Sequence, residues 1–216
     1  MRPSPQRELL DHAPPAEARA NLADLVRINR WFGGRRLVAQ LAAELLPADK
    51  RCTVLDVGAA SGDMGAALRR TLPLAQVISL DRSEHHLHAA PFPKLVGDAF
   101  ALPFAPRSVD VVMANLFLHH FSDDEIICLL KAFRNVSRRG VLIIDLLRHP
   151  VARYFLPATR WLFRWNSITL HDGPVSVDAA FQRRELTWLA KQAGYQYCKV
   201  RCHHPWFRLS LVEKTE

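Results

Sequence analysis

The sequence has few cysteines and no long apolar run, and each shortage excludes a class of protein. Four cysteines in 216 residues are too few for a disulfide scaffold. No apolar run approaches the roughly 18 residues of a membrane span. Residues 1–20 also lack the apolar stretch of a secretory signal. We therefore expect a cytoplasmic protein without a membrane span.

A metal site is also not predicted. Cys198 and Cys202, followed by His203 and His204, superficially resemble a metal cluster. They fall in an alternating segment that is typical of a strand, and a zinc finger would need a second ligand pair at suitable spacing. No such pair is evident in the sequence.

The charge is unbalanced, with 29 Lys and Arg against 21 Asp and Glu and a net charge of +8. Such a charge permits an anionic partner. The basic residues are scattered, however, and most of the doublets lie near expected helix ends, where the helix dipole favours cations. We interpret the charge as a solvated surface and do not predict a nucleic-acid partner from it. The doublets are Arg35-Arg36, Arg69-Arg70, Arg138-Arg139 and Arg183-Arg184.

The first third of the chain leads from an irregular arm into helices. With 49% hydrophobic and 23% charged residues, the chain has the composition of one globular domain with a substantial core. Residues 1–15 carry four prolines, which indicates a loose arm. Apolar periodicity predicts helices over 16–30 and 35–46. We expect the segment 29–34 between them to fold over a ligand as a lid.

The central segment alternates apolar strands with helices, a pattern that implies parallel pairing and right-handed crossovers. The fold class is therefore α/β, with a Rossmann-like, doubly wound, mostly parallel sheet of seven strands. The expected strands are 53–57, 76–80, 94–96, 109–114, 141–145, 195–202 and 206–213, with helices over 63–71, 83–88, 123–137 and 178–193.

We expect a single domain with a helical insertion after the fifth strand. Its aromatic and arginine-rich residues indicate a cap over the core. The predicted divisions are an arm with N-terminal helices (1–46), a cofactor-binding core (47–147), the cap (148–177) and a C-terminal helix with two strands (178–216).

The turn after the first strand carries the clearest functional signal. Residues 54–63 read VLDVGAASGD: an apolar strand, a turn of small residues and the start of a helix. In open α/β sheets such a turn faces the ligand. Gly58 and Gly62 let the backbone approach a ligand closely, and the amides that open the helix can receive a carboxylate. The G-x-G-x-x-G of dinucleotide enzymes is absent.

Polar residues follow the next three strands. Asp81 ends the second strand, where a carboxylate can accept hydrogen bonds from ribose hydroxyls. The alternative is a helix N-cap, a role better suited to Ser83. Asp98 follows the third strand, and its alternative role is an ordinary Gly-Asp turn. Asn115 lies at the exit of the fourth strand.

In order and spacing, residues 50–146 resemble class I S-adenosylmethionine-dependent methyltransferases, whose first motif is usually D-x-G-x-G-x-G. Ala60 replaces the middle glycine, and its methyl is tolerable if its φ stays negative. The resemblance implies S-adenosyl-L-methionine as cofactor, with Asp98 accepting from the adenine amino group and Asn115 beside the methionine end. The implied cofactor-binding residues are Asp56, Gly58, Ala59, Ala60, Gly62, Asp81, Arg82, Asp98, Ala99 and Asn115.

The segment 116–121, Leu-Phe-Leu-His-His-Phe, looks like the small-molecule branch that includes ubiquinone and menaquinone biosynthesis methyltransferases. In that branch a histidine here often faces the acceptor. His119 and His120 are therefore candidate catalytic residues, as a base or as acceptor-orienting groups. The alternative is that one packs and the other caps the next helix. His171, beside Asp172 in the cap, is a third catalytic candidate, with an ordinary turn as its alternative.

A sulfonium is already electrophilic, so catalysis needs alignment of the acceptor, and a hydroxyl acceptor also benefits from a base. We expect methylation of a small molecule, with O-methylation of a phenolic, quinone-like or polyketide acceptor favoured. Two alternatives stay open: an RNA or protein methyltransferase that uses the basic surface, and a non-catalytic cofactor-binding accessory protein. Residues 115–118 lack the prolines typical of enzymes that methylate base amines, which argues against nucleic-acid methylation.

Overall fold

The computed structural model describes residues 3, 6, 8–91 and 93–215. Its centre is a seven-stranded sheet in the order β3-β2-β1-β4-β5-β7-β6. The strands β1 to β5 pair in parallel, and β7 runs antiparallel to both β5 and β6. The predicted mostly parallel α/β sheet is confirmed. The strands are β1 (Cys52–Val57), β2 (Ala75–Asp81), β3 (Lys94–Val96), β4 (Val109–Asn115), β5 (Ser137–Leu146), β6 (Lys199–His203) and β7 (Arg208–Lys214).

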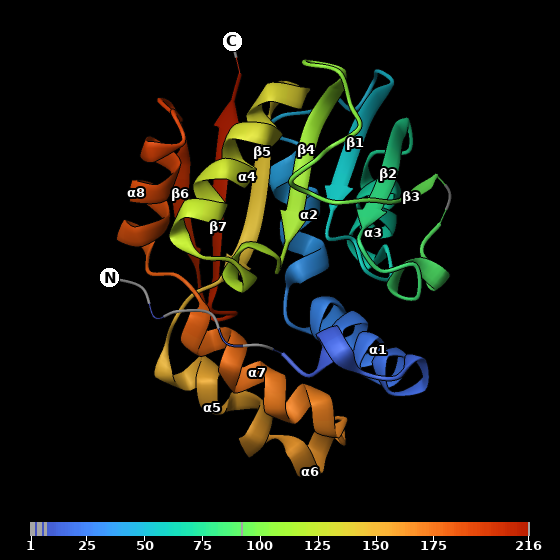
Figure 1. Cartoon of the computed structure of the whole chain (residues 1–216), viewed down its shortest axis with the longest axis vertical. Helices are drawn as coiled ribbons and strands as arrows, with labels where there is room; N and C mark the ends of the chain where they lie inside the picture. Colours follow the sequence, from blue (N-terminus) through green and yellow to red (C-terminus); the bar gives the residue numbers. More distant parts are fainter. Residues whose placement is uncertain (1–2, 4–5, 7, 92, 216) are drawn as a thin grey trace.

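Helices cover both faces of this sheet (Figure 1). The central strands are almost continuously apolar because both of their faces are buried. Leu55 packs into one core with α4 (Asp123–Val136) and α8 (Arg183–Gln192). Its neighbour Val54 packs into a second core with α2 (Gly34–Ala42) and α3 (Asp63–Thr71). Adjacent strand residues thus serve opposite cores, as the pleat requires.

A third layer lies beyond the carboxyl ends of β1, β2 and β4 (Figure 1). It consists of α1 and of three helices that follow β5 in the chain. We call these three helices the cap, and their position after the fifth strand is as predicted. The backbone amide of Asn166 donates to Asp24 Oδ2 at 2.7 Å, and so does the Thr169 hydroxyl at 3.0 Å, which joins the cap to α1. The elements are α1 (Pro15–Trp31), α5 (Pro150–Ala158), α6 (Arg160–Phe163) and α7 (Ser167–Ala179), with short 3₁₀ turns η1 (Leu10–His12), η2 (His86–Ala89) and η3 (Leu118–His120).

The predicted helix over 178–193 is wrong in its first part. Between α7 and α8 the chain is extended, and Phe181 is fully buried. The Phe181 amide donates to the Leu146 carbonyl at 3.3 Å, and its carbonyl accepts from the Arg148 amide at 2.9 Å. Burial of this phenylalanine against the end of β5 overrides the helical pattern. The last two strands also begin later than predicted, at Lys199 and Arg208.

The predicted loose arm is wrong for the residues that the structure describes between 8 and 12. The backbone amides of Leu9 and Leu10 donate to the two carboxylate oxygens of Asp172, at 2.9 and 3.0 Å. Ser176, one turn further along α7, donates its hydroxyl to Glu8, which is buried. Two side chains of the cap therefore hold this part of the arm.

None of the described helices combines the length and apolarity that crossing a bilayer needs.

Candidate active site

A cavity of about 910 Å³ lies at the carboxyl edge of the parallel strands, and the arm, α1, the cap and the β6–β7 turn all contribute to its wall. Its volume is within the range of small-molecule sites. The structure brings nine of the ten predicted cofactor-binding residues to this wall. They are Asp56, Gly58, Ala59, Ala60, Asp81, Arg82, Asp98, Ala99 and Asn115, whereas Gly62 is not part of the lining. The predicted lid segment contributes Asn29 and Phe32.

The turn after β1 depends on its glycines. Gly58 has φ 67°, and a Cβ there would lie 2.3 Å from Cδ2 of Phe117. Gly62 also has φ 67° and precedes α3. Ala60 has φ 47°, so the negative φ that would make its methyl tolerable without strain is not present. Its backbone amide donates to Asp81 Oδ2 at 2.9 Å, a hydrogen bond that holds the residue in the left-handed region.

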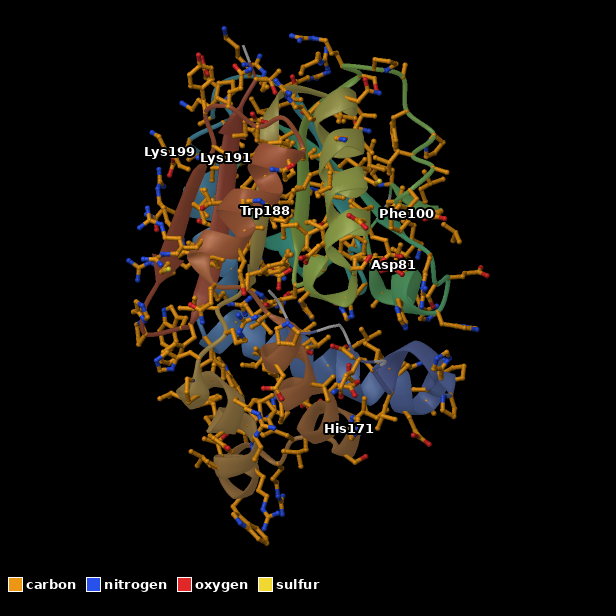
Figure 2. The ribbon with its side chains drawn as sticks, turned by 60° about the vertical axis from the view of Figure 1, so that its left-hand side comes forward. Asp81, Phe100, His171, Trp188, Lys191 and Lys199 are labelled. Atoms are coloured by element: carbon orange, nitrogen blue, oxygen red, sulfur yellow. The ribbon has the colours of Figure 1, made fainter. Side chains whose placement is uncertain are left out.

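Asp81, at the end of β2 (Figure 2), accepts hydrogen bonds from two backbone amides, one in the turn after β1 and one in the segment that follows β2. Oδ2 accepts from Ala60, and Oδ1 accepts from the amide of Ser83 at 2.9 Å. Burial alone would raise the pKa of Asp81, but hydrogen bonds from His86, Ser83 and Ala60 hold that pKa below its ordinary value. Asp81 is therefore a charged acceptor at the cavity wall. Asp81 does not cap the following 3₁₀ turn η2, whose N-cap residue is His85; the Ser83 hydroxyl accepts from the amide of His86 at 3.4 Å. The ribose role of Asp81 stays a prediction.

Asp98, the predicted acceptor for the adenine amino group, is exposed. Its Oδ1 accepts from the amide of Phe100 at 2.9 Å, so the local turn suggested by the sequence is present. The second carboxylate oxygen forms no hydrogen bond with the described residues, and Asp98 lines the cavity. The adenine contact stays a prediction.

Four buried polar atoms along this wall have no hydrogen-bond partner among the described residues. They are Asp56 Oδ2, Asp63 Oδ2, Asn115 Oδ1 and Arg208 Nη1, and all four residues line the cavity. Burial raises the pKa of Asp56 to about 8, with the charges of Asp63 and Asp81 adding to the effect. Buried polar atoms are nearly always paired in native proteins. The residues therefore fit a polar ligand that supplies both donors and acceptors.

His119 also lines the cavity, and its side chain is hydrogen-bonded to Asp145. Its Nδ1 is 2.6 Å from Asp145 Oδ1, and Asp145 also accepts from the amides of Leu118 at 2.9 Å and Leu146 at 2.7 Å. On its other side, His119 Nε2 is 3.6 Å from Glu8 Oε1. Burial would lower the pKa of His119, but Asp145 and Glu8 raise it to about 10. His119 is therefore a cation at neutral pH.

Glu8 and His120 complete this cluster. His120 is half-buried, and its Nδ1 is 3.7 Å from Glu8 Oε1. Although burial opposes it, contact with both histidines lowers the pKa of Glu8 to about 2. The ligand atoms of Glu8, His119 and His120 lie within 4.8 Å of one another, a spacing that a divalent cation could bridge. The raised pKa of His119 favours a proton on Nε2 over a metal ion at that atom.

The structure does not bring His171 together with the other two histidines. It lies on α7 of the cap (Figure 2), its side chain is half exposed, and it is not part of the lining described for the cavity. Its Nδ1 is 2.9 Å from Asp172 Oδ1, so these adjacent residues do contact each other. Through Asp172 it is linked to the arm. The catalytic role of His171 remains a prediction.

Among the residues that the sequence analysis did not propose for the site are Glu8, Asp145 and Arg208. Asp145 is the last residue but one of β5, close to the edge where Asp81 ends β2, and that position was a usable signal. Glu8 stands in a proline-rich segment without periodicity, and Arg208 in an alternating strand. Neither has a local pattern that indicates a ligand site.

Comparison with known proteins identifies the domain. Residues 55–144 match the family model described as a methyltransferase domain. The chain is 36% identical over 105 residues to a malonyl-[acyl-carrier protein] O-methyltransferase of Xylella fastidiosa, covering 45% of this chain and 35% of that protein. It is 28% identical over 201 residues to a demethylmenaquinone methyltransferase of Chlorobaculum parvum, covering 85% of this chain and 81% of that protein.

A solved structure shows the same fold. Magnesium protoporphyrin IX methyltransferase of Synechocystis PCC 6803, solved with bound SAH, superposes with a TM-score of 0.58 at 16% identity, covering 85% of this chain and 84% of that one. The match to the Xylella protein spans only about a third of that protein's length. The prediction of a methyltransferase is confirmed for the core: residues 55–144 match a methyltransferase domain, and the fold around them is that of S-adenosylmethionine-dependent methyltransferases.

Proposed function

We propose that the protein transfers the methyl group of S-adenosylmethionine to an oxygen of a small phenolic, quinone-like or polyketide acceptor. One observation carries the proposal: a single cavity joins the cofactor turn after β1 to the histidine cluster of η3. A methyl donor at the first and an acceptor at the second would share one enclosed space. Enclosure of two reactants supplies most of the catalysis that a sulfonium needs.

The wall residues suit the parts of this cofactor. Asp81 would accept from the ribose hydroxyls and Asp98 from the adenine amino group. The unpartnered oxygens of Asp56 and Asn115 would face the methionine end. When bound, the cofactor supplies an electrophilic methyl group.

Several aromatic side chains line the cavity. Phe117 and Phe121 meet edge to face with ring centroids 4.9 Å apart, and Phe32 and Phe155 do the same at 4.8 Å. With Trp206 they line the cavity and favour a flat, apolar acceptor. The names of the relatives, one an O-methyltransferase and one acting on demethylmenaquinone, agree with an oxygen or quinone-like acceptor.

The two histidines are assigned different roles. His119 already carries a proton at neutral pH, so it would orient the acceptor by donating a hydrogen bond and would not take a proton. Glu8, with its low pKa, is a weak base. His120 is therefore assigned as the group that removes the hydroxyl proton.

Calorimetry with S-adenosylhomocysteine, followed by turnover on a panel of phenols, tests the proposal. Asp81→Ala should weaken cofactor binding by a few kcal/mol at most, since it removes charge-assisted hydrogen bonds. His120→Ala should instead lower turnover by about 10²–10⁴ with little change in cofactor affinity. Asp178→Asn, on the cap surface, is the control and should change neither.

Each alternative gives a different result. Absence of S-adenosylhomocysteine binding by the wild-type protein would overturn the proposal. Binding without turnover of any acceptor would favour the accessory protein, and a salt-sensitive gel shift with RNA would favour an RNA methyltransferase.

A further inference from the structure

Arg208 is a buried cation on which the charges of Asp145 and Asp63 act without forming an ion pair. It opens β7, is 2% exposed and lines the cavity. Its Nη2 donates to Asn29 Oδ1 at 3.0 Å, and Nη1 has no partner. Among the described residues no carboxylate forms an ion pair with it. Burial lowers the pKa of Arg208 to about 10, which still leaves the guanidinium charged at neutral pH. Such a charge is expensive to bury unless a ligand completes its pairing.

Asn29 and Gly34 determine where the guanidinium of Arg208 lies. A Cβ at Gly34, the first residue of α2, would lie 2.7 Å from Asn29 Oδ1 and 3.2 Å from Arg208 Nη2. Glycine at this position therefore allows Asn29 to reach the guanidinium. With Nη2 fixed in this way, Nη1 remains at the cavity wall. The planar guanidinium suits a carboxylate, which can accept two parallel hydrogen bonds.

Unpartnered groups of the opposite character line the same wall. Oδ2 of Asp56 and Oδ2 of Asp63 have no partner, although Asp63 Oδ1 accepts from Arg35 at 2.6 and 2.9 Å. A cationic donor beside Asp56 would lower its raised pKa and favour its charged form. Asp63 is close enough to Asp56 and to Arg208 for its charge to act on both: it adds to the rise in the Asp56 pKa and opposes the fall in the Arg208 pKa that burial causes. An α-amino acid group, with an ammonium beside a carboxylate, offers what both sides lack.

We propose that Arg208 binds a carboxylate of a ligand in this cavity. This inference rests on the proposed function. The neighbouring acidic residues favour the α-carboxylate of the cofactor's amino-acid end as the source, and a carboxylate on the acceptor is the other source of the same chemistry.

The experiment compares S-adenosylhomocysteine with 5′-methylthioadenosine, which lacks the amino-acid end, by calorimetry. Arg208→Met should weaken S-adenosylhomocysteine binding roughly 10- to 100-fold and change 5′-methylthioadenosine binding by less than about twofold. Arg208→Lys keeps the charge and should fall between wild type and Arg208→Met, and it carries the test if Arg208→Met does not fold. Arg201→Met, on the adjacent strand β6 and paired with Glu44, is the control and should match wild type.

A second arm tests the other source. Malonate and benzoate are added to protein saturated with S-adenosylhomocysteine, and the melting temperature is measured. Stabilisation of wild type but not of Arg208→Met, with both nucleoside affinities unchanged, would assign the carboxylate to the acceptor. Equal loss of both nucleosides, or no effect in either arm, would overturn the inference. A wild-type protein that does not bind S-adenosylhomocysteine would overturn the proposed function. Malonate and benzoate would then be added to the protein without any nucleoside, and stabilisation of wild type but not of Arg208→Met would decide for Arg208 alone.

Discussion

Ala60 is held in a conformation that suits glycine better. A left-handed backbone brings an alanine Cβ close to the following carbonyl oxygen and costs about 1–2 kcal/mol. Part of this cost is offset by the hydrogen bond from its amide to Asp81. The methyl group of Ala60 belongs to the turn assigned to the cofactor, so a strained residue lies in the proposed cofactor site.

Ala60→Gly should therefore raise the free energy of unfolding by up to about 1 kcal/mol, because relief of strain exceeds the added entropy of the unfolded chain. The midpoint of urea unfolding measures this change. Ala59→Gly is the matched control: Ala59 has no positive φ, so the same substitution should cost about 0.4–1 kcal/mol. A lower midpoint for Ala60→Gly would show that its conformation is not strained.

The charged pair of His119 and Glu8 predicts a pH dependence. The pKa of His119 is raised from 6.5 to about 10, so its stabilisation is complete below pH 6.5 and is lost as the pH rises towards 10. The pKa of Glu8 is lowered from 4.5 to about 2, so its contribution is complete above pH 4.5 and is lost as the pH falls towards 2. The cluster should stabilise the fold most between pH 4.5 and 6.5.

Unfolding by urea at pH 6 and pH 9 tests the alkaline limb. The wild-type protein should lose at least about 1 kcal/mol more than His119→Gln over this interval, because the variant has no imidazolium to deprotonate. Parallel losses in the two proteins would show that His119 is not held as a cation.

Among the elements, those that carry strong periodicity could be predicted and those fixed by distant contacts could not. The strands β1 and β4 and the helix α4 follow from apolar pattern and, for α4, from the capping box of Ser122 and Glu125. The extended link at Phe181 depends on pairing with Leu146, some 35 residues away, which no local pattern encodes. The same holds for Glu8, which reaches the site only because the cap binds the arm.

The contact between the arm and the cap predicts a local effect of Asp172. Asp172→Ala removes the acceptor for the amides of Leu9 and Leu10, so residues 8–12 should exchange their amide hydrogens at least about tenfold faster. Asp178→Asn lies on the same helix, where it binds Arg153 at the surface, and should leave that exchange unchanged. Unaltered protection in Asp172→Ala would mean that other contacts hold the arm.

At the scale of the whole molecule, the cavity is lined by residues of the sheet edge, the arm, α1, the cap and the β6–β7 turn, which are far apart in the sequence. A ligand that binds there binds only the folded protein, and its binding energy adds to stability. S-adenosylhomocysteine at 100 times its dissociation constant should add about 2.7 kcal/mol, which raises the melting temperature by roughly 5–10 °C for a chain of this size. Differential scanning calorimetry measures the shift, and adenine at the same concentration serves as control. An unchanged melting temperature would exclude this cofactor.

The two ends of the cap meet at one place. Arg148 enters it and Phe181 leaves it, and the two are joined by a backbone hydrogen bond of 2.9 Å beside the end of β5. An insertion whose entrance and exit touch can be lengthened, shortened or exchanged while the strands beneath keep their pairing. Proteins that share this cofactor-binding core can in this way acquire new acceptors. Only about thirty contiguous residues of the cap change, and the cofactor-binding residues outside the cap stay the same.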